Sequence, residues 1–153
     1  MKLNHFLIPY LGVLGLMFIS ILTSGGIAWY ESLTLPSWHP SLYTIAVIWT
    51  VIYLCLIWSL LIFWNKGAHD TRCMLGITGF VALASINVAW CALFFNLHLI
   101  DLSIIAGLSL ALIAAILSLL ILPRSKKAAL LLLPYVLWVL FGTYLTYTVS
   151  LLN

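Results

Sequence analysis

Five long hydrophobic segments follow one another along the chain, with short polar connections between them. Each has about the 20 residues that an α-helix needs to cross the ~30 Å hydrocarbon core of a bilayer. Strands of a membrane barrel would be about half as long and would alternate apolar with polar positions. The pattern therefore predicts five transmembrane helices, over residues of about 6–23, 43–64, 73–96, 102–122 and 128–152.

The composition favours the same class of protein. Of the 153 residues, 65% are hydrophobic and only 6% are charged. A soluble domain of this length buries only part of its apolar surface, so a large part of these side chains would be left in water. We therefore expect one all-α integral membrane domain over residues 1–153, folded as a five-helix transmembrane bundle.

The basic residues predict the orientation of the bundle. In a five-span protein the N-terminus, the second connection and the fourth connection lie on one side of the membrane. These three segments contain every basic residue of the sequence: Lys2, Lys66, Arg72, Arg124, Lys126 and Lys127. Because Lys and Arg are enriched on the cytoplasmic side, we expect a cytoplasmic N-terminus, with the first connection and the C-terminus outside. This topology explains the net charge of +3 without a nucleic-acid partner.

Ionisable side chains are absent from the middle of the predicted helices. The acidic residues and histidines fall in connections or near helix ends: Glu31, Asp70, Asp101, His5, His39, His69 and His98. Ion-coupled carriers place such groups at membrane depth, and haem iron normally takes an axial ligand there. The sequence also has no G-x-S-x-G or H-E-x-x-H motif and no closely spaced cysteines. We expect neither a hydrolase nor a metal site.

The first connection and the helix after it are unusually rich in aromatic residues. Residues 29–53 read WYESLTLPSWHPSLYTIAVIWTVIY, with three of the seven tryptophans, three tyrosines, two prolines and a single charge, Glu31. Large flat rings in a segment restrained by prolines, at the mouth of a bundle, indicate a lid over a site for a flat apolar ligand. His39 is the imidazole nearest to this site, and a solvated loop histidine is the alternative interpretation.

Three predicted helices carry aromatic and polar side chains at helical spacing, so that each set forms a continuous patch. The sets are Ile45, Trp49 and Tyr53; then Asn87, Trp90 and Phe94, with Phe95 beside them; then Tyr135, Trp138, Gly142 and Leu145, flanked by Phe141. Their depths match, so they can converge beneath the lid as an aromatic pocket with one buried amide. Helix packing or an interfacial aromatic belt is the alternative for any single patch.

Small residues recur at a spacing of four on two predicted helices. They are Ser103, Gly107, Ala111 and Ala115 on the fourth helix, and Thr78 and Ala82 on the third. Such ridges let helices approach closely. Packing within the bundle and a homodimer seam are equally compatible with this pattern.

Several separated motifs resemble those of one membrane family. They are W-Y-x-x-L-x-x-P-S-W-H-P at residues 29–40, followed by Trp49 and Tyr53; Asn87-x-x-Trp90 with Phe94-Phe95; and Pro134-Tyr135-x-x-Trp138-x-x-Phe141-Gly142-Thr143. In this order they resemble the tryptophan-rich sensory protein/translocator protein (TspO/MBR) family, also called peripheral benzodiazepine receptors. The resemblance covers essentially the whole chain, with a length typical of bacterial members.

The resemblance implies a five-helix bundle, usually dimeric, that binds porphyrins such as protoporphyrin IX, and also isoquinoline carboxamides and benzodiazepines. Carried over residue by residue, it implies pocket positions at Trp38, Ile45, Trp49, Asn87, Trp90, Phe94, Trp138, Gly142 and Leu145. The lid and the patches add Trp29, Tyr30, His39 and Tyr53 as candidate ligand-binding residues. Some bacterial relatives degrade protoporphyrin in light, and Trp49 and Trp138 best match the tryptophans on which that chemistry depends.

The function expected from these patterns is tetrapyrrole binding in a bacterial cell membrane. Protoporphyrin IX is the expected ligand or substrate, and no other cofactor is required. Light- and oxygen-dependent degradation, transport or sensing without chemistry, and a purely structural partner-binding bundle are the alternatives. Leu145 and Tyr147 begin a sterol-recognition pattern, but no basic residue follows in 148–153, so cholesterol binding is not predicted.

Overall fold

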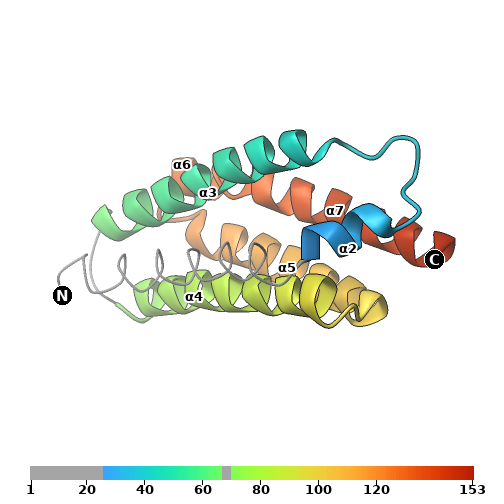
Figure 1. The fold of residues 1–153 in the computed structure, drawn as a ribbon. Helices are drawn as coiled ribbons and strands as arrows, with labels where there is room; N and C mark the ends of the chain where they lie inside the picture. The colour runs from blue at the N-terminus through green and yellow to red at the C-terminus, as the bar shows by residue number, and fades with distance from the viewer. Residues whose placement is uncertain (1–25, 67–69) are drawn as a thin grey trace.

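The computed structural model describes residues 26–66 and 70–153, and all regular secondary structure there is helical (Figure 1). The predicted first span, over about 6–23, lies outside the described residues. The elements are α2 (Gly26–Ser32), α3 (Leu42–Asn65), α4 (Thr71–Cys91), the π-helix η1 (Ala92–Asn96), α5 (Ile100–Ile121), α6 (Lys126–Leu130) and α7 (Leu133–Leu152).

Within the described residues, four helical stretches are long and apolar enough to cross a membrane: Leu42–Asn65, Thr71–Asn96, Ile100–Ile121 and Lys126–Leu152. Their ends lie within two residues of the second to fifth predicted spans. Figure 1 shows them side by side, with the end of α3, the start of α4 and the end of α5 at one end of the bundle. Outward-facing leucines such as Leu119 and Leu137 stay largely exposed, which suits a helix surrounded by hydrocarbon.

The helix boundaries follow local signals in the sequence. The Ser41 hydroxyl accepts a hydrogen bond from the Thr44 N–H (3.1 Å) at the start of α3. The Asp70 carboxylate accepts one from the Cys73 N–H (2.8 Å) at the start of α4. Both replace hydrogen bonds that the first turn of a helix lacks. At the end of α5, Pro123 follows two residues after the last helical residue, Ile121, and cannot continue the helix.

The last predicted span is a broken helix. The span predicted over 128–152 is found as Lys126–Leu152, but it contains an interruption between α6 and α7 that the prediction lacked. Pro134 lies in the first turn of α7, where it lacks an N–H and its ring crowds the carbonyl four residues earlier. The chain therefore turns before this proline and starts a new helix.

Two serines from neighbouring helices support the interruption. Ser59 of α3 donates a hydrogen bond to the Ala128 carbonyl (2.7 Å), and Ser118 of α5 donates one to the Ala129 carbonyl (3.0 Å). Ser59 is fully buried. Since lipid offers no hydrogen bonds, hydroxyls of adjacent helices are the usual partners for backbone groups at such breaks.

The ridge of small residues on α5 packs within the chain. Ser103, Gly107 and Ala111 are buried, and α7 is the helix that packs most extensively against α5. A Cβ atom on Gly107 would collide with the Thr143 side chain of α7. Gly107 therefore serves close packing of α5 against α7, and Ser103 and Ala111 are buried within the same chain.

The first connection is not a loop throughout. Among its described residues, the first part forms α2, which carries Trp29 and Tyr30, and residues 33–41 lack regular structure. Tyr30 is buried because α2 lies against η1. The expected lid is therefore a short anchored helix followed by a loop.

Candidate functional site

Five aromatic side chains from α2, the end of α4 and η1 pack together; we call them the outer ring cluster. Its members are Trp29, Tyr30, Trp90, Phe94 and Phe95. The Trp90 and Phe94 rings are stacked with centroids 5.3 Å apart, and Trp29 meets Phe94 edge-on at 5.2 Å. Tyr30 also meets Phe94 and Phe95 edge-on. These contacts hold α2 against the end of α4, as aromatic pairs do in protein cores.

The wide turn of η1 positions part of this cluster. The Leu97 N–H donates to the Ala92 carbonyl five residues back (2.9 Å), which is the hydrogen-bond pattern of a π-helix. His98 follows with a φ of 57°, and its imidazole stacks on Trp29 at 4.0 Å. His98 was not among the predicted site residues, because its stacking on Trp29 depends on a π-helical turn that residue spacing does not predict.

A hydrogen bond ties the loop to α2. The Tyr30 hydroxyl lies 2.6 Å from Nε2 of His39. Burial raises the pKa of Tyr30 to about 12, and burial lowers the pKa of His39. Near neutral pH the phenol is therefore protonated and the imidazole is neutral, so Tyr30 donates to Nε2.

A second tie joins the loop to the end of α7. The Thr34 N–H donates to Oδ1 of Asn153 (2.9 Å), and Nδ2 of Asn153 donates to the Thr34 carbonyl (3.1 Å). The same Nδ2 also donates to the Val149 carbonyl (2.9 Å), which orients the amide. We call the two hydrogen bonds between Thr34 and Asn153 the loop latch. Sequence analysis missed it, since a lone asparagine 119 residues away carries no local signal.

The tip of the loop lies on α7 and extends a row of rings there. Trp38 stacks on Tyr144 with centroids 5.6 Å apart and meets Phe141 edge-on at 5.9 Å. Phe141 in turn stacks on Trp138 at 5.1 Å. These four side chains, Trp38, Trp138, Phe141 and Tyr144, form a continuous aromatic wall.

The aromatic wall borders a groove of about 460 Å³ between α3 and α7. The groove is lined by Val47, Ile48, Val51, Ile52, Pro134, Leu137, Trp138 and Phe141. Val51 and Leu137 are more than half exposed, so the groove opens toward the surface that faces hydrocarbon. Its size and apolar lining are typical of small-molecule sites.

Behind the groove, three helices meet through a buried polar contact. Trp49 of α3 stacks on Tyr53 (5.2 Å) and meets Tyr135 of α7 edge-on (6.1 Å). Nδ2 of Asn87 on α4 donates to the Tyr135 hydroxyl (3.2 Å), and both residues are buried. The amide expected in the pocket thus has a protein partner that links α4 to α7.

The structure divides the expected site residues into groups. Trp29, Tyr30, Trp90 and Phe94 pack on one another in the outer ring cluster, with His39 bonded to Tyr30. Trp49, Tyr53 and Asn87 meet around Tyr135 behind the groove, and Trp138 lines it, with Trp38 at the end of its wall.

The remaining three expected residues are differently placed. Ile45 is half-buried near the start of α3, and Leu145 on α7 is buried. Gly142 has no atom within 4 Å of the point where a Cβ would stand. There is therefore open space beside Gly142, next to Phe141 on the same helix.

Comparison with known proteins gives a consistent result. The TspO/MBR family profile matches residues 6–152. The Tryptophan-rich protein TspO of Chlorobaculum tepidum is 33% identical over 129 residues, which cover 82% of this chain and 79% of that protein. The Tryptophan-rich protein TspO of Archaeoglobus fulgidus is 36% identical over 129 residues, covering 82% of this chain and 80% of that protein. The Translocator protein of Sus scrofa is 30% identical over 149 residues, covering 94% of this chain and 84% of that protein.

The resemblance inferred from the aromatic motifs is thereby confirmed by a match over nearly the whole chain. The four long apolar helices among residues 26–66 and 70–153 agree with it. This chain is an integral membrane protein and belongs to the TspO/MBR family.

Proposed function

We propose that this protein binds a flat, apolar tetrapyrrole such as protoporphyrin IX in the groove between α3 and α7. The aromatic wall is the observation that carries this proposal. A macrocycle lying against Trp138 and Phe141 would gain about 0.5–1.5 kcal/mol per ring contact beyond the burial of apolar surface. The valine and isoleucine side chains of α3 would cover its other face.

The propionates of the porphyrin would lie at the loop end of the groove. Trp38 is partly exposed there, and its indole N–H is a donor for a carboxylate. Trp29 on α2 offers a second indole at the same end of the bundle. Isoquinoline carboxamides are also flat and largely apolar, so the same wall suits them.

The bundle that holds this site is proposed to have five spans in a single domain, with the first over residues of about 6–23. The described basic residues lie in or directly beside the connections at the end of the bundle opposite the loop; they are Lys66, Arg72, Arg124, Lys126 and Lys127. The positive-inside tendency then favours a cytoplasmic N-terminus and an external loop, in a bacterial cell membrane. A homodimer follows from the family resemblance.

We propose light- and oxygen-dependent degradation as the fate of the bound porphyrin. Light excites the macrocycle, and Trp138 is the indole proposed to donate an electron to the excited ring. The reduced ring passes this electron to O₂ to give superoxide, and the Trp138 radical cation takes an electron back from the porphyrin. Superoxide then adds to the porphyrin radical cation, so that O₂ is the net oxidant and the tryptophan is restored. Trp49 lies behind the groove on α3 and is the second tryptophan assigned to this chemistry. Burial among apolar side chains would keep the reactive products close to the ring.

Transport or sensing without chemistry is the second candidate function. The observation that favours it is the opening of the groove between Val51 and Leu137, both largely exposed. An apolar molecule in the membrane could enter and leave by this side without being altered. In that case the protein would bind and release porphyrin unchanged.

Tryptophan fluorescence quenching by protoporphyrin IX in detergent, followed by absorption spectra before and after illumination, tests these proposals. Saturable quenching with loss of the porphyrin bands and a new bilin-like band supports degradation. Saturable quenching with unchanged bands leaves a carrier or sensor. Quenching that does not saturate would favour a purely structural bundle without a porphyrin site.

Two matched variants locate the site. Trp138→Phe keeps an aromatic ring in the groove, so binding should remain within a few-fold while photodegradation slows strongly. Trp58→Phe changes a tryptophan on the exposed face of α3 and should alter neither. An unchanged degradation rate in Trp138→Phe would show that Trp138 is not the electron donor.

A further inference from the structure

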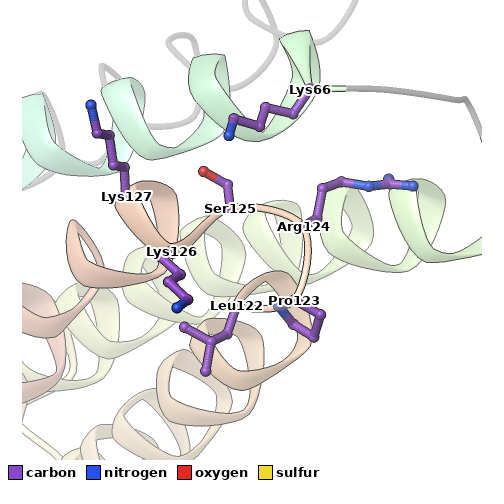
Figure 2. A pocket seen from close by; sticks show the side chains of 7 residues that line it. All are labelled: Lys66, Leu122, Pro123, Arg124, Ser125, Lys126 and Lys127. Carbon is purple, nitrogen blue, oxygen red and sulfur yellow. The ribbon is translucent and has the colours of Figure 1, made fainter.

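A second hollow lies at the end of the bundle opposite the loop, where α5 ends and α6 begins. Its volume is about 440 Å³, and its lining is Lys66, Leu122, Pro123, Arg124, Ser125, Lys126 and Lys127. Figure 2 shows Lys66 and Lys127 on one side of this connection and Lys126 on the other side, near Leu122. Four of the lining side chains are cations, and the proposed porphyrin site uses none of them.

Acidic side chains do not balance this charge. The sequence has three acidic residues. Glu31 on α2 and Asp101 in the first turn of α5 lie at the loop end of the bundle. Asp70, the acid at the basic end, is held by Arg124, with Oδ2 2.7 Å from Nη2. The Cys73 N–H and the Arg124 guanidinium lower the pKa of Asp70, so this pair is charged at neutral pH and the lysines remain uncompensated.

Arg124 lines the hollow, but its side chain points away from the three lysines (Figure 2). Its guanidinium lies over the Phe63 ring, 5.6 Å from the ring centre, while Nη2 bonds Asp70. Nη1 is buried and has no hydrogen-bond partner among the described residues. Arg124 therefore adds positive charge beside the hollow, while the lysines are the donors that an anion can reach.

The hollow lies at the level where lipid headgroups are expected. It is formed by Lys66 directly after α3, the connection after α5 and the start of α6. These segments lie at the ends of membrane-spanning helices. Leu122, 40% exposed, and Pro123 add apolar surface beside the cations. A phosphate ester linked to acyl chains presents the same combination of an anion next to hydrocarbon.

We propose that this basic hollow binds the phosphate of an anionic phospholipid headgroup. The phosphate lies among the lysine ammonium groups, which are flexible enough to converge on it. The acyl chains run beside Leu122 along α5. Basic pockets between membrane helices are a recurrent form of headgroup site.

The test uses the full chain reconstituted in phosphatidylcholine with spin-labelled phosphatidylglycerol or spin-labelled phosphatidylcholine as probes. We expect selective binding of phosphatidylglycerol that weakens with salt. Neutralising Lys66, Lys126 or Lys127 by substitution with Gln should lower this affinity about five-fold for each lysine. Arg72→Gln, at the same end but outside the hollow, should change it less than about two-fold.

Variants with Arg at the three lysine positions keep the charge and should retain selectivity. They decide the question even if a Gln variant does not fold. Equal affinity for both lipids, or an equal loss with Arg72→Gln, would overturn the proposal. Full displacement of the probe by inorganic phosphate at millimolar concentration would also overturn it, because the occupant would then be a soluble anion.

Discussion

Helix α7 meets its two neighbours in opposite ways. Toward α5 it packs closely, with Thr143 against the backbone of Gly107. Toward α3 it makes few contacts and leaves a groove lined by Trp138 and Phe141. Both faces are apolar, so hydrophobicity does not distinguish them.

The difference lies in side-chain size. Helices in a membrane associate through close packing, because lipid tails are as apolar as the side chains themselves. A glycine and alanines on α5 allow the backbones to approach, whereas the large rings on the other face of α7 hold α3 away. One helix can therefore be both a rigid support and one wall of a site.

Replacing the glycine in the tight seam should have the largest effect. In Gly107→Ala the new methyl group collides with Thr143, whose hydroxyl is already bonded to the Val139 carbonyl. We expect a loss of about 2–3 kcal/mol in the free energy of unfolding, as for an overpacked core. Thermal unfolding in detergent would measure it. Gly142→Ala is the matched control, since open space beside it predicts no loss.

Removing the serine that supports the break between α6 and α7 should rank second. Ser59→Ala leaves the Ala128 carbonyl without its buried donor, which should cost about 2 kcal/mol and loosen α3 further from α7. The same unfolding assay applies. Ser109→Ala removes only a hydroxyl bonded within its own helix and should change stability by less than about 0.5 kcal/mol. Equal losses would mean that the break needs no support from α3.

Filling the groove tests the loose interface directly. Val51→Phe adds a ring at the α3 wall and should weaken saturable quenching by protoporphyrin IX about ten-fold, a change of 1.4 kcal/mol. Leu112→Phe makes a comparable change on the exposed face of α5 and should leave quenching unaffected. Unchanged affinity in Val51→Phe would place the porphyrin elsewhere, next to the outer ring cluster.

Opening the loop latch should have an effect of about the same size, confined to the loop. Asn153→Ala removes both hydrogen bonds to Thr34, and their net contribution is about 1–2 kcal/mol. Hydrogen exchange of the Thr34 amide should accelerate by about ten-fold. Asn153→Asp keeps the acceptor for that amide but loses the donor, so its exchange rate should lie between the two. An unaltered rate in Asn153→Ala would show that other contacts close the loop.

Acidification should produce the smallest change. Because the pKa of His39 is lowered in the closed loop, the open loop binds the proton more readily. Closure is therefore fully stable above the ordinary pKa of 6.5 and weakens as pH falls through that value toward the lower pKa of the closed state. Exchange of Thr34, corrected for intrinsic pH effects, should rise between about pH 7.5 and about pH 5.5. His39→Gln should abolish this dependence.

Much of the fold follows from sequence because its causes are local. Long apolar runs produce the four described spans, Ser41 and Asp70 cap helix starts, and Pro123 ends α5. The grouping of Trp49 with Tyr53, and of Trp90 with Phe94, also follows from helical spacing. The interruption before Pro134 could not be predicted, since a proline near the start of a helix does not by itself require a break.

The candidate site was only partly predictable. Its aromatic residues were selected from composition and spacing, but their division between the outer ring cluster and the groove was not. The π-turn of η1 brings His98 onto Trp29, and the loop carries Trp38 onto Tyr144. Each contact joins segments whose relative position depends on how whole helices pack.

The sequence by itself determined that this is a helical membrane protein with all described cations at one end and a ring-rich connection at the other. Those properties depend on composition and on neighbours three or four residues apart. Only the tertiary structure decided which face of α7 packs closely against its neighbour and which borders a groove. It also decided that Asn153 is hydrogen-bonded to the loop. These outcomes depend on side-chain volumes and hydrogen bonds between segments far apart in the chain, where no local pattern specifies the partner.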